Sequence, residues 1–211
     1  MHPATPSPPL SIGLFQALER HAREQPQSIA CASRFRLASY RKLWSRIERA
    51  TARLQGEWTV GAGDVVAYCG DGHPDALVLY AALARCGAVL LPLEHEAARD
   101  ALPRLAGEVA LKLALYDDEL SPPRVAQPAY PLSMLIGTPC AHQATVRIPG
   151  PDAVSLLRLE NNGSLRRLSL RQLADGPASG QRDIHGALFD ADVFGPVVLP
   201  ALCAGATLTW R

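Results

Sequence analysis

Hydrophobic residues recur with helical spacing over the first quarter of the chain. The apolar positions of residues 12–24 fall on one stripe of a helix, and Pro26 marks the end of the helix that this stripe predicts. A second stripe runs over residues 40–54 after Ser39, a favourable N-cap residue, and it has arginine and lysine on the opposite, solvated face. Two short strands are predicted between these helices, at residues 28–32 and 35–37.

Beyond residue 64 the pattern changes to unbroken apolar runs that alternate with helical segments. These segments predict strands at 65–69, 88–91 and 109–115 and helices at 76–85 and 96–106. Gly87 ends the first of these helices in the manner of a C′ glycine. Strands that are apolar on both faces and alternate with helices indicate a parallel sheet covered on both sides. The predicted fold class is therefore α/β, with a mostly parallel sheet flanked by helices.

Changes in composition divide the chain into four parts. We expect a proline-rich flexible arm over residues 1–10, a first α/β subdomain over 11–116, a linker or long loop over 117–130, and a second, partial α/β subdomain over 131–211. The last part is predicted to contain strands at 132–136, 144–148, 153–159 and 206–210, and helices at 169–174 and 193–204.

The charge balance narrows the classes of function. The 211 residues carry 21 Lys and Arg against 20 Asp and Glu, a formal net charge of +1, which argues against a nucleic-acid or anionic-membrane binder. Two apolar runs, over 76–93 and 194–210, are interrupted by proline and glycine, so no membrane span is expected. The start of the chain lacks the features of a signal peptide, and the five cysteines lack metal-ligand spacing. We expect a cytoplasmic protein with reduced thiols and no metal site.

Four segments resemble motifs of one enzyme family, and they occur in the family's order. They are similar, in turn, to its "LTYxEL", "GVxxGDxVAI", "LKAGAxYVPLD" and "LPLLAGATLV" segments: Leu37–Leu43, Val60–Ala67, Leu83–Leu93 and Leu199–Leu208. The family is that of the adenylate-forming enzymes, which include acyl-CoA synthetases, peptide-synthetase adenylation domains and luciferases. The resemblance covers most of residues 12–116, resumes over 152–211, and implies the fold of the N-terminal subdomain of these enzymes. Scaffold motifs alone do not assign a function.

The phosphate-binding loop of the family is degenerate in this chain. The resembling enzymes transfer the AMP part of ATP to a carboxylate, and they hold its phosphates with a Ser/Thr/Gly-rich loop that ends in Lys-Gly. The matching stretch, residues 153–173, has Glu160 where the phosphates would lie. A degenerate ATP loop would use Asn161, Asn162, Gly163, Ser164 and Arg166.

The same stretch also has the sequence of an ordinary hairpin turn over residues 160–163, which we favour. The two interpretations predict different backbones. A tight two-residue hairpin would remove nucleotide binding, whereas an open loop with converging N–H groups would restore it.

Three further residues correspond to substrate-side positions of the family. In one register Asp190 lies where amino-acid-activating members hold the substrate amine, and in another Asp192 replaces a histidine of acyl-activating members. His185 is a candidate substrate-side histidine. Each of the three also has a simpler interpretation as an exposed loop residue. No catalytic residue is predicted, because no nucleophile and base occur at catalytic spacing.

Two functions from different classes remain open. The first is a non-catalytic, truncated AMP-binding-enzyme-like protein that acts as a partner- or ligand-binding module. It would need no cofactor, and a homodimer or another protein would cover its exposed apolar surface. The alternative is a component of an acyl- or amino-acid-activating ligase that another chain completes and that uses ATP and Mg²⁺. A fragment without independent function is the third interpretation.

Overall fold

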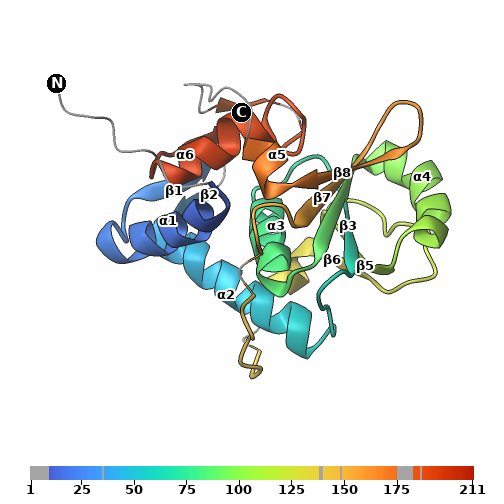
Figure 1. Ribbon diagram of the computed structural model, residues 1–211, viewed down its shortest axis with the longest axis horizontal. Coiled ribbons are helices and arrows are strands. Elements are labelled where there is room, and N and C mark those ends of the chain that lie inside the picture. The colour runs from blue at the N-terminus through green and yellow to red at the C-terminus, as the bar shows by residue number, and fades with distance from the viewer. Residues whose placement is uncertain (1–9, 35, 138–139, 148, 175–182, 186) are drawn as a thin grey trace.

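Helices and strands alternate along the chain in the computed structural model, which describes residues 10–34, 36–137, 140–147, 149–174, 183–185 and 187–211 (Figure 1). The first elements are α1 (Leu10–Glu24), β1 (Ile29–Ser33), β2 (Arg36–Ser39), α2 (Tyr40–Gly56), β3 (Val65–Cys69), α3 (Asp75–Cys86), β4 (Val89–Leu93), α4 (His95–Glu108) and β5 (Leu111–Tyr116). They are followed by β6 (Ala129–Pro131), the 3-10 helix η1 (Leu132–Leu135), β7 (Val154–Leu159), β8 (Leu165–Ser169), α5 (Leu170–Ala174), β9 (Asp183–Ile184), the π-helix η2 (Phe194–Val198), α6 (Leu199–Cys203) and β10 (Leu208–Trp210). All of the predicted arm except Leu10 lies outside the described residues.

A six-stranded sheet in the order β6-β5-β3-β4-β7-β8 carries helices on both faces. Its neighbouring strands run parallel except for the antiparallel hairpin of β7 and β8. Alternate residues of β3 serve the two faces: Val66 and Tyr68 join the core under α3, whereas Ala67 and Cys69 join the core under α4. Figure 1 shows α4 and α3 on opposite sides of this sheet. The predicted α/β class, with a mostly parallel sheet flanked by helices, is confirmed.

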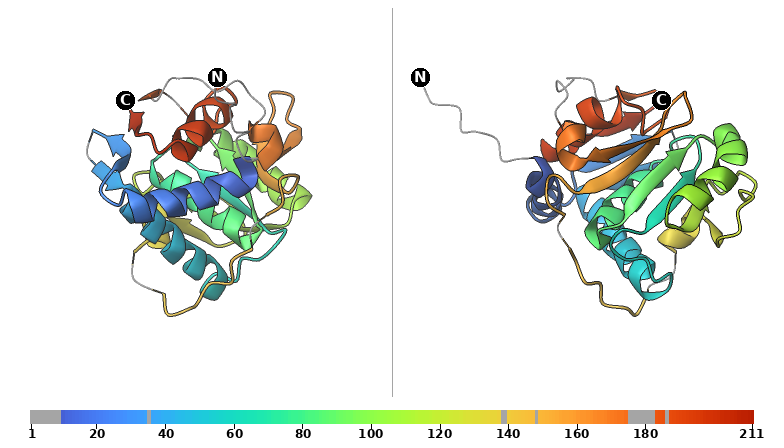
Figure 2. Two further views of the ribbon diagram at one scale, coloured as in Figure 1. Left: turned by 60° about the vertical axis from the view of Figure 1, so that its left-hand side comes forward. Right: turned by 45° about the vertical axis from the view of Figure 1, so that its right-hand side comes forward.

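A second, four-stranded sheet has the order β2-β1-β10-β9, and it pairs strands of residues 29–39 with strands of residues 183–210 (Figure 2). The strand β10 lies parallel between β1 and β9, so that Cys31 is paired with Leu208. The Tyr40 hydroxyl donates to the Ala206 carbonyl at 2.7 Å and strengthens this junction. Both sheets therefore take strands from residues 11–116 and from residues 131–211. The division of the chain into those two units stays a prediction.

The ends of the two central helices follow from single residues. Ser39 caps α2, because its side-chain oxygen accepts the Lys42 N–H at 3.3 Å. Gly87 ends α3 with φ of 73°, a left-handed conformation that costs glycine little. Both caps agree with the sequence prediction.

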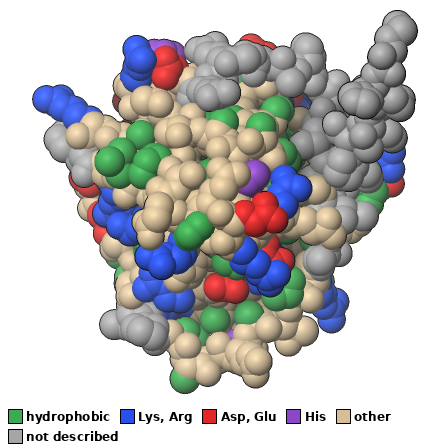
Figure 3. All heavy atoms as spheres, turned by 90° about the vertical axis from the view of Figure 1, so that its left-hand side faces the viewer, with side chains coloured by type: hydrophobic (Ala, Val, Ile, Leu, Met, Phe, Trp, Pro, Cys, Tyr) green, Lys and Arg blue, Asp and Glu red, His purple; other side chains and the backbone are tan. Residues whose placement is uncertain are grey.

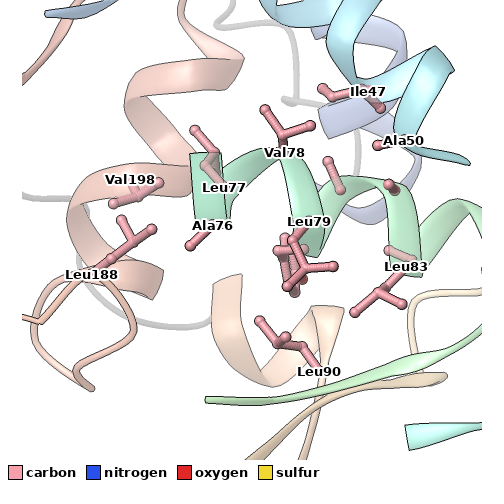
Figure 4. Packing of buried hydrophobic residues seen from close by; sticks show 14 of the residues in the cluster. Ile47, Ala50, Ala76, Leu77, Val78, Leu79, Leu83, Leu90, Leu188 and Val198 are labelled. Atoms are coloured by element: carbon pink, nitrogen blue, oxygen red, sulfur yellow. The ribbon is translucent and has the colours of Figure 1, made fainter. Parts of the chain in front are cut away.

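The helix α3 is the centre of the larger core, and every residue from Asp75 to Cys86 is buried. Figure 4 shows Leu79 and Leu83 on the side of Leu90 of β4, and Ile47 of α2 beyond the opposite side of the helix. A fully buried leucine contributes about 1.5–3 kcal/mol relative to an exposed one, so this helix is a major source of stability. It has no polar stripe because sheet and helices surround it.

Two predicted strands are wrong. Residues 132–135 form the 3-10 helix η1, in which Leu132 and Leu135 are three positions apart and both buried. The Asp118 carboxylate accepts the N–H of Ser133 at 3.0 Å and favours this turn. Residues 144–147 have no regular structure, since the N–H and carbonyl of Thr145 bond to the Gln55 side chain, each at 2.8 Å. Residue 148 lies outside the described residues.

Candidate functional site

Three parallel strands, β3, β4 and β7, end at one edge of the six-stranded sheet. After β3 the chain turns to α3 on one face, whereas after β4 it turns to α4 on the other. Adjacent strands whose connections leave in opposite directions open a crevice at the carboxyl edge of a sheet. A pocket of about 580 Å³ lies at this edge. It is lined by the last residues of the three strands, Tyr68 of β3 among them, by residues that follow these strands, and by residues 187–191.

Acidic side chains outnumber basic ones in the pocket. Glu94, Glu160 and Asp190 contribute carboxylates, and Arg158 is the only Lys or Arg among the described residues that line it. The Arg158 guanidinium also donates to the Phe189 carbonyl at 3.4 Å. The apolar part of the lining includes Pro92, Leu93, Leu159, Leu188 and Phe189. The pocket therefore places one cation and several anions beside an apolar wall.

The hairpin of β7 and β8 ends in a turn whose backbone donors are largely engaged. The Glu160 N–H donates to the Ser164 carbonyl at 2.9 Å, and the Gly163 N–H donates to the Glu160 carbonyl at 2.8 Å. The Ser164 N–H donates to Asn162 Oδ1 at 2.9 Å. Arg104 of α4 holds the turn from outside, because its guanidinium donates to the Gly163 carbonyl at 3.1 Å.

The hairpin that the sequence favours is thus present, but in a three-residue rather than a two-residue form. Residues 161–163 lie between the bonded pair of Glu160 and Ser164. Gly163 has φ of 80°, and this left-handed residue makes room for the additional position. The turn is closed by its own bonds rather than open with converging N–H groups.

The pocket brings together three of the predicted site residues: Asn161, Gly163 and Asp190. Five others do not line it: Asn162, Ser164, Arg166, His185 and Asp192. The Asn162 side chain accepts the Ser164 hydroxyl at 2.7 Å, which keeps both side chains within the turn. Arg166 is exposed and lies opposite Arg158 in the register of β7 and β8. His185 and Asp192 are exposed. The binding roles of all eight stay predictions.

A buried polar pair, which the sequence did not indicate, lies at the pocket: Tyr68 lines it and Asp117 does not. The Tyr68 hydroxyl donates to Asp117 Oδ1 at 2.7 Å and accepts the N–H groups of Gly72 at 3.3 Å and His73 at 3.0 Å. Asp117 Oδ2 accepts the Asp71 N–H at 3.1 Å. Together these bonds hold the loop of residues 70–73, two of whose glycines line the pocket.

Burial governs the ionisation of this pair. Removal from water raises the pKa of the Asp117 carboxyl above its usual value, and the bonds from Tyr68 and from the Asp71 N–H oppose that shift. Burial, followed by the charge of Asp117, raises the pKa of the Tyr68 hydroxyl far above its usual range. The hydroxyl is therefore neutral and remains a donor at physiological pH.

One signal could have located the pair. Tyr68 is polar in a strand that is otherwise apolar, and Asp117 follows the predicted strand of residues 109–115. Polar side chains at the carboxyl ends of neighbouring parallel strands lie close together. The order of the strands, which the sequence does not state, was needed to apply that rule.

A second buried charge cluster belongs to the scaffold rather than to the pocket. Asp75, at the first position of α3, accepts from Arg36 and from Arg46, each at 2.7 Å. Asp75 does not line the pocket of residues 187–191, and its partners are on β2 and α2. The cluster ties the four-stranded sheet to the central helices.

The described residues offer little for other site chemistries. No group of three His, Cys, Asp or Glu side chains within them is placed to hold a metal ion. Cys31, Cys69 and Cys86 are free and buried, and burial raises the pKa of each thiol to about 12. Within the described part of the chain, no helix has the length and apolar character needed to cross a membrane. Figure 3 shows one face on which Lys and Arg are interspersed with Asp and Glu rather than gathered in a patch.

The comparison with protein families gives one match to most of the chain. The profile of the AMP-binding enzyme family matches residues 18–161. The D-alanine–D-alanyl carrier protein ligase of Bacillus licheniformis is 26% identical over 102 residues, which make up 48% of this chain and 20% of that protein.

Solved structures share the fold. NpsA-ThdA, an artificially fused adenylation-PCP di-domain NRPS from Klebsiella oxytoca, has a TM-score of 0.77 at 20% identity over 93% of this chain and 39% of its own. The NpsA N-terminal subdomain of the same organism, in complex with 3-hydroxybenzoyl-AMSN, has a TM-score of 0.72 at 20% identity over 93% and 53%. O-succinylbenzoate coenzyme A synthetase of Bacillus subtilis has a TM-score of 0.75 at 14% identity over 92% and 43%.

These matches agree with the motifs in the sequence. The chain spans a fifth of the curated relative and roughly half or less of the solved structures. The family profile nevertheless covers more than half of the chain. The chain therefore belongs to the AMP-binding enzymes, the adenylate-forming family that its sequence resembles.

Proposed function

We propose that this chain is a non-catalytic ligand-binding module of the AMP-binding enzyme family, which binds an amino acid in the pocket and does not by itself bind ATP. The observation that carries the proposal is the closed turn of residues 160–164. A triphosphate needs several backbone N–H groups that point at it. Three of those groups in the turn, on Glu160, Gly163 and Ser164, already have acceptors.

The charges of the pocket also disfavour a triphosphate. Glu94, Glu160 and Asp190 line the pocket, and Arg158 is the sole lining Lys or Arg among the described residues. Two like charges about 4 Å apart repel by about 4 kcal/mol at an effective dielectric constant of about 20. A ligand with several negative charges is thus opposed at the place where the family holds phosphate. The residues present therefore do not fit ATP.

The same charges suit a zwitterion. The Arg158 guanidinium can pair with a carboxylate, and Glu160 or Asp190 can accept from an ammonium group. The apolar wall of Leu188 and Phe189 can receive a side chain. The curated relative acts, by its name, on D-alanine, which is an amino acid of this kind.

Calorimetric titration with both enantiomers of alanine and phenylalanine tests the proposal. At about −0.3 kcal/mol per non-hydrogen atom, phenylalanine is expected to bind with a roughly millimolar Kd. Arg158→Ala is expected to weaken binding about tenfold through loss of the charged hydrogen bonds, whereas the exposed Arg167→Ala is the matched control. Binding of MgATP at millimolar concentration, or release of pyrophosphate by the chain alone, would refute the proposal.

The second candidate is a component of an acyl- or amino-acid-activating ligase that another chain completes. The partial coverage of the relatives supports it, since the match covers 53% of the NpsA N-terminal subdomain. Pyrophosphate release from ATP, Mg²⁺ and an amino acid, measured with and without the polypeptide encoded beside this one, decides between the two. Release only in the mixture favours the component; amino-acid binding with no release in either favours the module.

A protein partner is a separate proposal. Leu37, on the edge strand β2, is 61% exposed, and Met134 is 45% exposed. Edge strands with apolar side chains are places where a second copy or another protein can pair. Sedimentation equilibrium of wild type and Leu37→Lys tests this: a dimer that the substitution dissociates supports it, and a monomer in both contradicts it.

A further inference from the structure

The polar pair of Tyr68 and Asp117 is not among the proposed contacts to a ligand, yet Tyr68 lines the pocket and donates to Asp117, which does not line it. Tyr68 is 1% exposed and Asp117 is 8% exposed. A buried carboxylate costs free energy unless it is hydrogen-bonded, so a pair of this kind needs a reason. In this protein the pair holds the backbone of the loop of residues 70–73.

The pair holds three successive N–H groups of the loop of residues 70–73. The N–H groups of residues 71, 72 and 73 all donate to it: Asp71 to Asp117, and Gly72 and His73 to the Tyr68 hydroxyl. From the other side, Trp210 Nε1 donates to the Gly72 carbonyl at 3.1 Å. The N–H groups of residues 71–73 thus depend on side chains. Backbone bonds hold the two ends of the loop, since the Gly70 N–H donates to the Leu93 carbonyl at 3.1 Å and the His73 carbonyl accepts the Ala76 N–H at 2.8 Å.

The fit between loop and pair leaves no room for adjustment. A Cβ atom on Gly70 would lie 2.3 Å from Asp117 Oδ2 and 2.6 Å from the Tyr68 hydroxyl. Gly72 has φ of 92°, a conformation that residues with a Cβ rarely adopt. Both glycines line the pocket, and so the position of its wall follows directly from the Tyr68–Asp117 pair.

We propose that Tyr68 and Asp117 are positioning residues, which fix the loop of residues 70–73 as the wall of the pocket and thereby set its affinity for the ligand. The part of the inference that concerns ligand affinity rests on the proposed function, whereas the part that concerns the position of the loop does not. Neither residue needs to react. Tyr68 supplies one acceptor for two N–H groups while its proton is committed to Asp117, so the hydroxyl has a single orientation.

The test replaces the hydroxyl alone. Tyr68→Phe keeps the ring and removes the acceptor of two N–H groups. Tyr80→Phe is the control for the loss of a buried hydroxyl, since Tyr80 is also buried and bonds through its hydroxyl to Ser155 Oγ at 3.2 Å. Tyr68 lines the pocket and Tyr80 does not, so Asp117→Asn, at a residue that does not line it either, tests the effect of the loop without changing the lining. Each full-length variant is compared in urea unfolding, amide hydrogen exchange and titration with phenylalanine.

We expect Tyr68→Phe to raise the exchange rates of the Gly72 and His73 amides at least about tenfold and to weaken phenylalanine binding about tenfold. Tyr80→Phe is expected to change neither the exchange rates nor the affinity, even if it lowers the urea midpoint as much as Tyr68→Phe does. Asp117→Asn keeps an oxygen acceptor for Tyr68 but turns a donor towards the Asp71 N–H. Its affinity is expected to lie between those of wild type and Asp117→Ala, and it replaces Tyr68→Phe if that variant does not fold.

Two results would overturn the inference. Unchanged exchange at Gly72 and His73 in Tyr68→Phe would mean that the hydroxyl does not hold the loop. Faster exchange with unchanged affinity would mean that the loop does not set binding. If wild type binds no amino acid, the proposed function fails; the exchange rates then still decide whether the pair positions the loop.

Discussion

Asp75 compensates two guanidinium groups at the start of α3, and replacing it with asparagine tests how much that charge stabilises the fold. Its side chain is 6% exposed, and it bonds to Arg46, which is 11% exposed, and to Arg36, which is 46% exposed. Asparagine keeps the shape of the side chain and removes the charge. The buried Arg46 then loses its counter-ion, whereas Arg36 can turn to solvent.

The expected magnitude follows from the burial of each partner. Removal of one member of a buried ion pair costs about 3–5 kcal/mol, because the remaining charge stays buried without a partner. The half-exposed Arg36 adds about 0–1 kcal/mol, since solvent screens it. We therefore expect Asp75→Asn to lower the free energy of unfolding by about 3–5 kcal/mol. For a domain of this size, 1 kcal/mol corresponds to about 2–4 °C in Tm.

Urea unfolding followed by circular dichroism measures this loss. Asp152→Asn is the control, because Asp152 and Arg171 form an exposed ion pair and its loss is expected to leave the urea midpoint unchanged. In Asp75→Asn combined with Arg46→Met, both buried charges are gone, and we expect most of the stability to return. Equal midpoints for Asp75→Asn and Asp152→Asn, or a double variant no more stable than Asp75→Asn, would refute the argument.

Three further outcomes are expected. A Cβ on Gly195 would lie 2.3 Å from a backbone oxygen, so Gly195→Ala should lower the urea midpoint. A Cβ on Gly107 would meet nothing within 4 Å, so Gly107→Ala should raise the midpoint, because alanine favours the helix more than glycine does. Because the folded pKa of Asp117 is raised above 3.8, wild type should gain stability relative to Asp117→Asn as the pH falls from the raised pKa to about 3.8, measured by urea unfolding across that range. Since burial raises the pKa of Cys69 to about 12, iodoacetamide at pH 8 should modify the half-exposed Cys140 first, as mass spectrometry would show.

Local patterns predicted the elements whose stability is local. The α2 helix follows its apolar stripe and its Ser39 cap, and α3 ends at Gly87, because caps and periodicity are properties of neighbouring residues. The strand predicted over 132–136 fails, since tertiary burial of Leu132 and Leu135 favours a 3-10 turn over an extended segment. Propensity is a weak signal for segments this short.

The candidate site was only partly predictable, because it is made where distant segments meet. Residues 160–163 show their turn in sequence, and Asp190 was identified through the family resemblance. Tyr68 and Asp117 are 49 positions apart, and only the pairing of β3 with β5 brings them together. The spacing of residues in the sequence does not predict which strands pair in the sheet.

The place of β10 between β1 and β9 has a consequence for the order of folding. The first strand of the chain cannot complete its sheet until residue 208 is available, because Cys31 pairs with Leu208. The His21 ring of α1 likewise contacts the Cys203 carbonyl at 3.1 Å. During synthesis, α3 and its neighbouring parallel strands can assemble early, whereas one apolar side of α1 stays exposed to solvent. Contacts across so long a separation are slow to form, and a ribosome-bound chain spends that interval most open to chaperones and to aggregation.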